Sequence, residues 1–279
     1  MNPLKKLVTK LKEGNLSELL SFFDFPRKIM TKYSTPKLKD MLDAGVHFGH
    51  RARRWNPKME KYIYTVSKNV HIIDLEQSED LLKKACEALF DIAKKGGKVI
   101  FVGTKKQARQ IIESEAKNCG AMYITERWIG GTITNFDVIR KTLDKFLTMI
   151  RNTEDGTYEK EGYTKKERLL IDRQIGRFQI NYGGIANMRG TPHALVVVDQ
   201  RRERTAIKEA KKAGVPVIGL IDTNADPTGI DYPIPGNDDA IKSIALIVNA
   251  LAGAVKVGYE EFEKDQKEEA GKKLKEAAK

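Results

Sequence analysis

Three short stretches of the chain are apolar at successive positions, and this feature constrains its fold more than any other. They lie at 98–102, 194–198 and 215–221, and they lack the polar–apolar alternation of a strand with one solvated face. Because neighbouring side chains on a strand point to opposite faces of its sheet, both faces of these strands must be covered. Such strands are typical of a parallel sheet with helices on both sides.

Helical patterns separate these strands. Helices are expected at 105–118 and 203–213, and Gly120 and Gly214 stand where those helices should end. The other expected elements are strands at 121–125 and 232–234 and a last helix capped by Asn237 and Asp238. The alternation predicts an α/β fold, in which a parallel sheet is covered by helices on both faces.

A different periodicity interrupts this alternation. Apolar residues recur three and four positions apart in two segments, which is the spacing of a coiled-coil seam. The seams consist of Phe136, Ile139, Leu143, Phe146 and Ile150, and of Ile171, Ile175, Phe178 and Tyr182. A polar turn at 154–162 joins them. We therefore expect an antiparallel coiled-coil hairpin at 134–184, inserted into a sandwich domain formed by 36–133 and 185–257.

The two ends of the chain differ from this central part. Residues 1–35 predict an amphipathic N-terminal extension, whose acidic residues argue against a transit peptide, and Met30 is an alternative start to Met1. Residues 258–279 mix Glu and Lys with few apolar residues. We expect a charged C-terminal tail there, either a frayed helix or a disordered segment, and assign it no function.

The net charge favours polyanionic partners. Fifty Lys and Arg face 38 Asp and Glu, which gives a formal charge of +12 and an isoelectric point near 9.4. Nucleic acid or an anionic membrane surface fits such a charge, and simple solubility is the alternative interpretation. No apolar run approaches the roughly 18 to 20 residues of a membrane span, so insertion is disfavoured. The isolated Cys86 and Cys119 offer no disulfide framework, and a reduced cytoplasm fits best.

Catalytic motifs are mostly absent from the sequence. Gly103 opens the first turn after a strand, but neither GxGxxG nor GxxxxGK[ST] follows. Asp199 and Asp222 directly follow predicted strands, with Asp226 close behind, and such carboxylates could hold Mg²⁺ in a phosphate-handling enzyme. Asp also caps turns and helices by bonding to local backbone, and we favour that interpretation. We expect no catalytic residue and no cofactor.

Histidine spacing offers only a weak metal signal. His47 and His50 have HxxH spacing but lack a nearby Cys or an HExxH helix, so we expect a structural or RNA-facing role and no metal.

Four basic clusters carry a stronger signal, because their cations can neutralise phosphate, and in two of them Trp55 or Trp128 could stack on a base. For single members, a merely solvated side chain is about as likely as RNA contact. The candidate RNA-binding residues are Arg51, Arg53, Arg54, Trp55 and Lys58; Lys105, Lys106 and Arg109; Arg127, Trp128 and Asn135; and Arg201 and Arg202, with Arg204 nearby.

Several long segments in fixed order resemble one family. They are Met41-Leu-Asp-Ala-Gly-Val-His-Phe-Gly-His, Arg54-Trp-Asn-Pro-Lys-Met, His71-Ile-Ile-Asp-Leu, Phe101-Val-Gly-Thr-Lys-Lys-Gln-Ala, Arg127-Trp-Ile-Gly-Gly-Thr-Ile-Thr-Asn-Phe, Asp222-Thr-Asn-Ala-Asp-Pro and Ile234-Pro-Gly-Asn-Asp-Asp-Ala. From about Pro36 to Gly258 the chain resembles small-subunit ribosomal protein number two, the bacterial "S-two" family. It departs from the family at Asn187-Met-Arg-Gly-Thr-Pro-His-Ala, where His193 stands in place of the usual Asp.

The resemblance implies a flavodoxin-like domain with a coiled-coil hairpin, bound to small-subunit ribosomal RNA in the cytoplasmic ribosome. It also implies neighbouring small-subunit proteins, among them the large mRNA-binding ribosomal protein number one. The expected function is therefore that of a structural constituent of the small subunit that supports translation. The alternatives are the phosphate-handling enzyme and a free RNA-binding regulator outside the ribosome.

Overall fold

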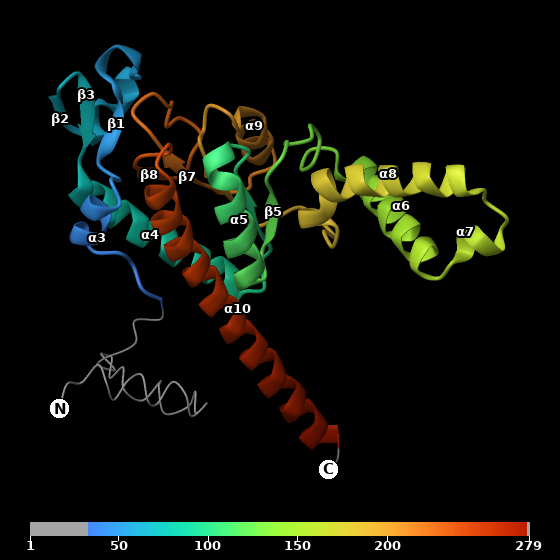
Figure 1. Cartoon of the computed structure of the whole chain (residues 1–279). Helices are drawn as coiled ribbons and strands as arrows, with labels where there is room; N and C mark the ends of the chain where they lie inside the picture. Colours follow the sequence, from blue (N-terminus) through green and yellow to red (C-terminus); the bar gives the residue numbers. More distant parts are fainter. Residues whose placement is uncertain (1–32, 278–279) are drawn as a thin grey trace, which may run out of the picture. The chain divides into compact units, whose positions relative to one another are not determined.

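The computed structural model describes residues 33–277, and side chains up to Glu269 (Figure 1). Most of the expected N-terminal extension at 1–35 lies outside the described residues. The central element is a five-stranded parallel sheet in the order β5-β4-β6-β7-β8. Its strands are β4 (Val99–Val102), β5 (Met122–Ile124), β6 (Ala194–Val198), β7 (Val217–Ile221) and β8 (Tyr232–Pro235).

Every residue of β4, β6 and β7 is buried, as the uninterrupted apolar runs require. One face of the sheet packs on α4 (Leu75–Lys94), α5 (Lys106–Cys119) and α10 (Ile241–Ala277). The other face packs on α9 (Arg204–Lys212) and on the chain around Trp128. The prediction of a parallel α/β fold is confirmed, and it is consistent with the flavodoxin-like type.

Successive residues of β4 illustrate why both layers are needed. Phe101 belongs to the apolar cluster under α4, α5 and α10, whereas Ile100 and Val102 belong to the cluster on the opposite face. Full burial of such a side chain contributes about 1.5–3 kcal/mol. Removing the helices from either side would therefore expose several large apolar residues at once.

The C-terminal segment is helical. α10 continues through Gly258 without a break and ends at Ala277, so of the two expected alternatives, a frayed helix or a disordered segment, the described residues form a helix. Tyr259, just beyond the predicted boundary, belongs to the domain, because its hydroxyl donates to the Gly97 carbonyl (3.0 Å) and accepts from the Val99 amide (3.2 Å).

The same helix corrects the statement about membrane spans. By length and composition alone, Ile241–Glu269 is apolar enough to cross a bilayer, whereas the sequence pattern disfavours membrane insertion. Its first 18 residues carry only two charges, Lys242 and Lys256. Its Ile244, Ile247, Val248 and Leu251 are buried in the core under the sheet, where α10 lies against α4 and α5. Core packing therefore accounts for its apolar character.

Two helices occupy the predicted hairpin. α6 (Phe136–Glu154) and α8 (Lys165–Tyr182) are joined by the short α7 (Thr157–Lys160), and they extend from the β5 edge of the sheet in Figure 1. Thr164 and Glu167 form a capping box that fixes the start of α8. The rings of Phe146 and Phe178, one from each predicted seam, lie 5.9 Å apart. The two helices thus contact one another through apolar residues of those seams.

A second, smaller sheet was not predicted. Strands β1 (Phe48–Arg51), β2 (Ile63–Ser67) and β3 (Val70–Ile73) pair antiparallel in the order β1-β3-β2. Lys68 and Asn69 between β2 and β3 both have positive φ, as the tight hairpin turn requires. The short elements nearby are α3 (Leu38–Asp43), η1 (Ala52–Arg54) and η2 (Pro57–Tyr62), and η3 (Gly183–Ile185) follows α8.

Two glycines of α10 should respond in opposite ways to the same substitution. A Cβ at Gly258 would lie 2.6 Å from the Ala93 Cβ and 2.8 Å from the Phe90 carbonyl, whereas a Cβ at Gly253 meets nothing within 4 Å. Gly253→Ala should stabilise the protein by about 0.5–1 kcal/mol through helix propensity. Gly258→Ala should destabilise it by about 1–3 kcal/mol, because α4 and α10 must separate. Urea unfolding measures both, and equal effects would contradict the close approach.

Candidate nucleic-acid interface

Polar residues gather where the central strands end. Asp199 follows β6, Asp222 follows β7, and Asp238 follows β8. Because the carboxyl ends of parallel strands lie at one edge of a sheet, these acids lie at the same edge. The side chain of His50 reaches this edge from β1, and its Nδ1 lies 2.8 Å from an Asp222 oxygen. The ammonium of Lys105, just before α5, lies 2.6 Å from both Asp238 and Asp239.

Burial and crowding perturb these groups. Burial, followed by the charges of Asp222 and Asp199, raises the pKa of Asp238 to about 7 even though Lys105 acts against it. The hydrogen bond to Asp222 raises the pKa of His50. Burial lowers the pKa of Lys105, but its carboxylate partners outweigh that effect and raise it. The acids therefore favour the cationic forms of Lys105 and His50, which neutralise part of their charge.

Metal ligands could in principle be drawn from this cluster. One ligand atom each from His50, Asp222, Asp238 and Asp239 lies within 4.8 Å of the others. However, the Lys105 ammonium already contacts Asp238 and Asp239. His47 is not a member of the group, so the HxxH pair does not form a common site in the described residues.

Asp199, Asp222 and Asp226, the trio considered as an alternative Mg²⁺ site, do not form a group of metal ligands within the described residues. Asp226 pairs instead with Lys58 at 3.0 Å, and its pKa is lowered to about 2, chiefly by a hydrogen bond from Thr228. Asp199 accepts hydrogen bonds from the amides of Arg201 and Arg202. Asn237 likewise accepts from two amides that precede α10. The capping interpretation of these turn residues is supported by these bonds.

Several predicted RNA-binding residues are engaged within the protein. Lys105 is buried among the acids, and Lys58 pairs with Asp226. Arg109 pairs with Glu126 at 2.7 Å. Trp128 is buried, and its indole N–H donates to Glu209 at 3.1 Å. Each of these side chains therefore has a partner within the protein.

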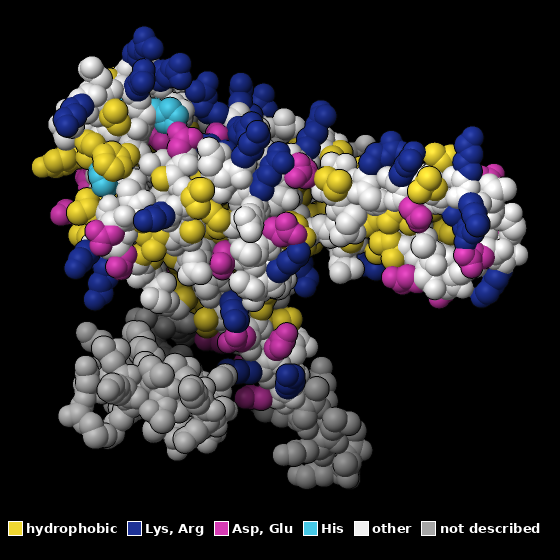
Figure 2. Space-filling model, in the orientation of Figure 1, with side chains coloured by type: hydrophobic (Ala, Val, Ile, Leu, Met, Phe, Trp, Pro, Cys, Tyr) yellow, Lys and Arg dark blue, Asp and Glu magenta, His cyan; other side chains and the backbone are white. Residues whose placement is uncertain are grey.

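The other predicted residues are exposed. Figure 2 shows Lys and Arg gathered over the tip of the small sheet and over the loops at the carboxyl ends of the central strands. The cations of this exposed remainder form no ion pair within residues 33–269. The exposed members are Arg51, Arg53, Arg54, Trp55, Lys106, Arg127, Asn135, Arg201 and Arg202.

The departure from the family pattern at His193 has a local role. Its Nδ1 accepts a hydrogen bond from the Lys98 amide at 3.0 Å, at the start of β4. A carboxylate could also accept this hydrogen bond, so His193 supplies the acceptor that the usual Asp could provide.

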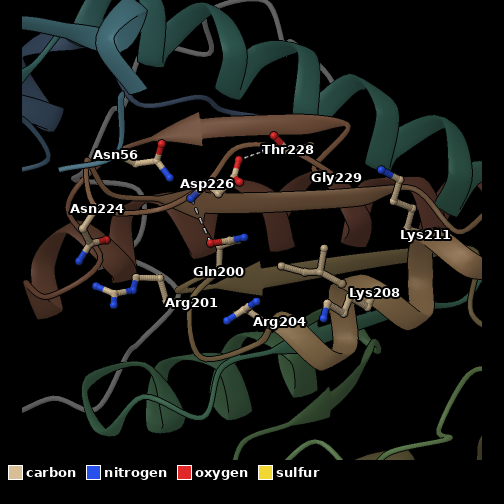
Figure 3. A pocket seen from close by; sticks show the side chains of 11 residues that line it. Asn56, Gln200, Arg201, Arg204, Lys208, Lys211, Asn224, Asp226, Thr228 and Gly229 are labelled. Carbon is tan, nitrogen blue, oxygen red and sulfur yellow. Dashed lines mark hydrogen bonds between the residues drawn. The ribbon is translucent and has the colours of Figure 1, made fainter. Parts of the chain in front are cut away.

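Sequence reasoning missed two features on α9. The first is Glu209, which accepts hydrogen bonds from Trp128 and from the amides of Gly131, Ile133 and Thr134. It holds the loop that leads into α6. The second is a basic cleft of about 390 Å³ beside α9 (Figure 3). Only the recurrence of Arg204, Lys208 and Lys211 on one helical face signals it in the sequence.

Glu209 should make stability depend on pH. Burial raises its pKa, but hydrogen bonds from backbone amides and Trp128 outweigh burial, so the pKa is lowered below its ordinary 4.5. The carboxylate therefore stabilises the fold above about pH 4.5, and that contribution is lost as pH falls through the lowered value. Glu209→Gln should cost about 1.5–3 kcal/mol at pH 7, the range for charged hydrogen bonds.

Urea unfolding of both proteins from pH 7 to pH 3 measures this effect. The difference between wild type and Glu209→Gln should shrink toward pH 3. Glu154→Gln is a suitable control, because Glu154 is exposed at the end of α6 and forms no ion pair within residues 33–269. A constant difference across the range would contradict the assignment of a stabilising carboxylate.

These observations define a parallel α/β protein whose acids at the strand ends are bound by its own cations and turns. Such an arrangement differs from a catalytic centre, and the surface around it is basic.

The sequence profile described as ribosomal protein S2 matches residues 41–258. The chain is 48% identical over 236 residues to the small ribosomal subunit protein uS2 of Synechocystis sp., which covers 81% of this chain and 87% of the relative. It is 50% identical over 221 residues to the uS2 protein of Ehrlichia chaffeensis (78% and 75%). It is 48% identical over 221 residues to uS2c of Cyanophora paradoxa (79% and 94%). The chain belongs to the ribosomal protein S2 family, and it is a structural protein and not an enzyme.

Proposed function

We propose that this protein is a constituent of the small ribosomal subunit, where it binds ribosomal RNA and supports translation in the cytoplasm. Its family membership supports the assembly. The RNA contact is supported by the segment at the tip of the small sheet. Its Arg51, Arg53 and Arg54 are exposed and form no ion pair within the described residues. Unpaired guanidinium groups at such density attract phosphate.

Trp55 complements these arginines. It is 38% exposed, and its ring lies 5.4 Å from the ring of buried His71. One part of the indole is therefore held by the protein, and another part is open to solvent. A ring held in this way loses little freedom when an unstacked base packs on it, so the segment combines phosphate neutralisation with stacking.

The helices α6 and α8 would extend the RNA-binding surface. In our proposal they form the antiparallel coiled coil of an inserted module at 134–184, with Phe146 and Phe178 in its seam. Arg173 and Arg177 on α8 are exposed and form no ion pair in the part of the chain described. A rigid hairpin with basic side chains fixes the position of one RNA helix relative to those bound by the sandwich domain.

Protein neighbours are also part of the proposal. Tyr64 and Val66, two positions apart on β2 of the small sheet, are 76% and 50% exposed. Exposed apolar side chains so close together mark interaction surfaces more often than isolated ones do. They support a contact with another small-subunit protein, and we propose the large mRNA-binding ribosomal protein number one as a candidate.

Sucrose-gradient sedimentation of a native lysate tests the assembly. The protein should migrate with the small subunit at constant stoichiometry, and ribonuclease that dismantles ribosomes should release it. Tyr64→Ser should leave the protein on the subunit but lower the amount of ribosomal protein number one there. Tyr163→Ser, at an exposed tyrosine before α8, is the matched control. Migration only as a free species would favour an RNA-binding regulator outside the ribosome.

A charge-matched pair of variants tests the RNA contact. About six to ten phosphate contacts should make the affinity for naked RNA fall by some three to five decades between 50 and 200 mM salt. The triple variant Arg51→Ala, Arg53→Ala and Arg54→Ala should reduce the slope of log K against log salt by about 3. Filter binding across that range measures it.

The control removes the same charge elsewhere. Lys84, Lys95 and Lys267 are exposed at α4, just after α4, and on α10. Their triple replacement by Ala should leave the slope almost unchanged. Equal losses in the two triples would mean that net charge alone drives binding, and the proposed contact would be wrong.

A further inference from the structure

A basic cleft lies beside α9, at the carboxyl ends of β6 and β7. It has a volume of about 390 Å³, which is within the roughly 300–1,000 Å³ of ligand pockets. Figure 3 shows Arg204 and Lys208 from α9 on one side and Asp226 and Thr228 from the β7–β8 loop on the other. We call it the α9 cleft.

The α9 cleft is strongly positive. Arg204, Lys208 and Lys211 recur at positions i, i+4 and i+7, so they lie on one face of the helix, and Arg201 joins them from the preceding turn. None of these four forms an ion pair within residues 33–269. The acid that lines the cleft, Asp226, pairs with the Lys58 ammonium and accepts a hydrogen bond from the Thr228 amide. An anion in the cleft would relieve the repulsion among the four cations.

Amide side chains stand beside these cations. The oxygens of Asn56 and Gln200 accept hydrogen bonds from the Lys58 and Asp226 amides, which fixes both carboxamides. Their NH₂ groups donate no hydrogen bond within the described residues. The Asn224 oxygen is buried and has no partner there either. The cleft is therefore lined by two donor groups, which a phosphate or a base can use, and by one unpartnered acceptor, which the N–H groups of a base edge can use and an ionised phosphate cannot.

The cleft continues the basic segment at the tip of the small sheet. Asn56 directly follows Trp55, and the Asn56 amide donates to the Thr223 carbonyl at 2.8 Å, which joins this segment to the β7–β8 loop. An RNA strand whose phosphates contact Arg53 and Arg54 would therefore pass the mouth of the cleft.

We propose that the α9 cleft binds a single unpaired nucleotide of an RNA strand, extruded from its helix, with its phosphate on the α9 cations and its base edge on the amides. This inference rests on the proposed RNA-binding function and names the form of RNA that the site takes. A paired duplex presents its phosphates but keeps its base edges in the stack, so it would leave the amides unused.

Two short RNA hairpins test the proposal with the full-length protein. One carries a single bulged nucleotide, and the other is the same hairpin without the bulge. The wild type should bind the bulged hairpin about tenfold more tightly, which is what one well-placed hydrogen bond at the upper end of the usual net range supplies. Asn224→Ala should remove most of this preference and leave the affinity for the paired hairpin nearly unchanged.

Matched variants on α9 keep the test independent of folding at Asn224. Lys208→Ala removes a cation that lines the cleft, and Lys212→Ala removes an exposed one that does not. Lys208→Ala should reduce the preference for the bulged hairpin by several-fold, and Lys212→Ala should not change it. Variants at Lys208 and Asn224 that weaken both hairpins equally would overturn the proposal, because the cleft would then be a plain phosphate contact.

Two further results distinguish the possible failures. Free AMP and inorganic phosphate are added as competitors, and neither should displace the bulged hairpin at micromolar concentration. Displacement by AMP at such concentrations would overturn the proposal in favour of a free nucleotide ligand. If the wild type binds neither hairpin, the proposed RNA-binding function itself is wrong, which is a different outcome from binding both hairpins without preference.

Discussion

The burial of both faces of β4, β6 and β7 is the constraint on which the rest of the structure depends. Strands that are apolar on both sides must be covered by two helical layers, here α4, α5 and α10 on one side and α9 on the other. The crossover connections that build such layers make the strands parallel, so their carboxyl ends lie at one edge of the sheet. The acids, the basic loops and the α9 cleft all lie at that edge, so the position of the candidate interface follows from the packing of the core.

The acids at this edge connect separate elements of the fold. Asp222 is 1% exposed and binds the amide and the ring of His50, which attaches the small sheet to the end of β7. Asp238 binds Lys105 and so ties the start of α5 to the start of α10. A buried carboxylate is costly unless it is paired and hydrogen-bonded, and these partners meet that requirement. An edge that serves catalysis in many α/β proteins is here part of the scaffold.

The Lys and Arg side chains fall into two groups, those paired with an acid and those left unpaired, and the local sequence does not distinguish them. Lys105 and Lys106 are neighbours, yet the first is buried against Asp238 and the second is exposed. Arg109 pairs with Glu126, whereas Arg204 has no ion pair within the described residues. A cation that is already paired has less to gain from phosphate than an unpaired one, because its partner must be displaced first. The unpaired group is therefore the one on which the proposed RNA contacts depend.

The sequence by itself determined the parallel sheet, its covering helices, the helical character of α6 and α8, and the family. These features follow from local patterns, since apolar runs and periodicity act within about twenty residues. It did not predict the small sheet, whose strands are short, and it left open whether the chain beyond Gly258 is helical or disordered. Only the tertiary structure decided which cations are free, that Glu209 holds the loop at Trp128, and that Asn56 and Asn224 share a cleft. Those contacts join residues some 80 to 170 positions apart, and no local pattern records them.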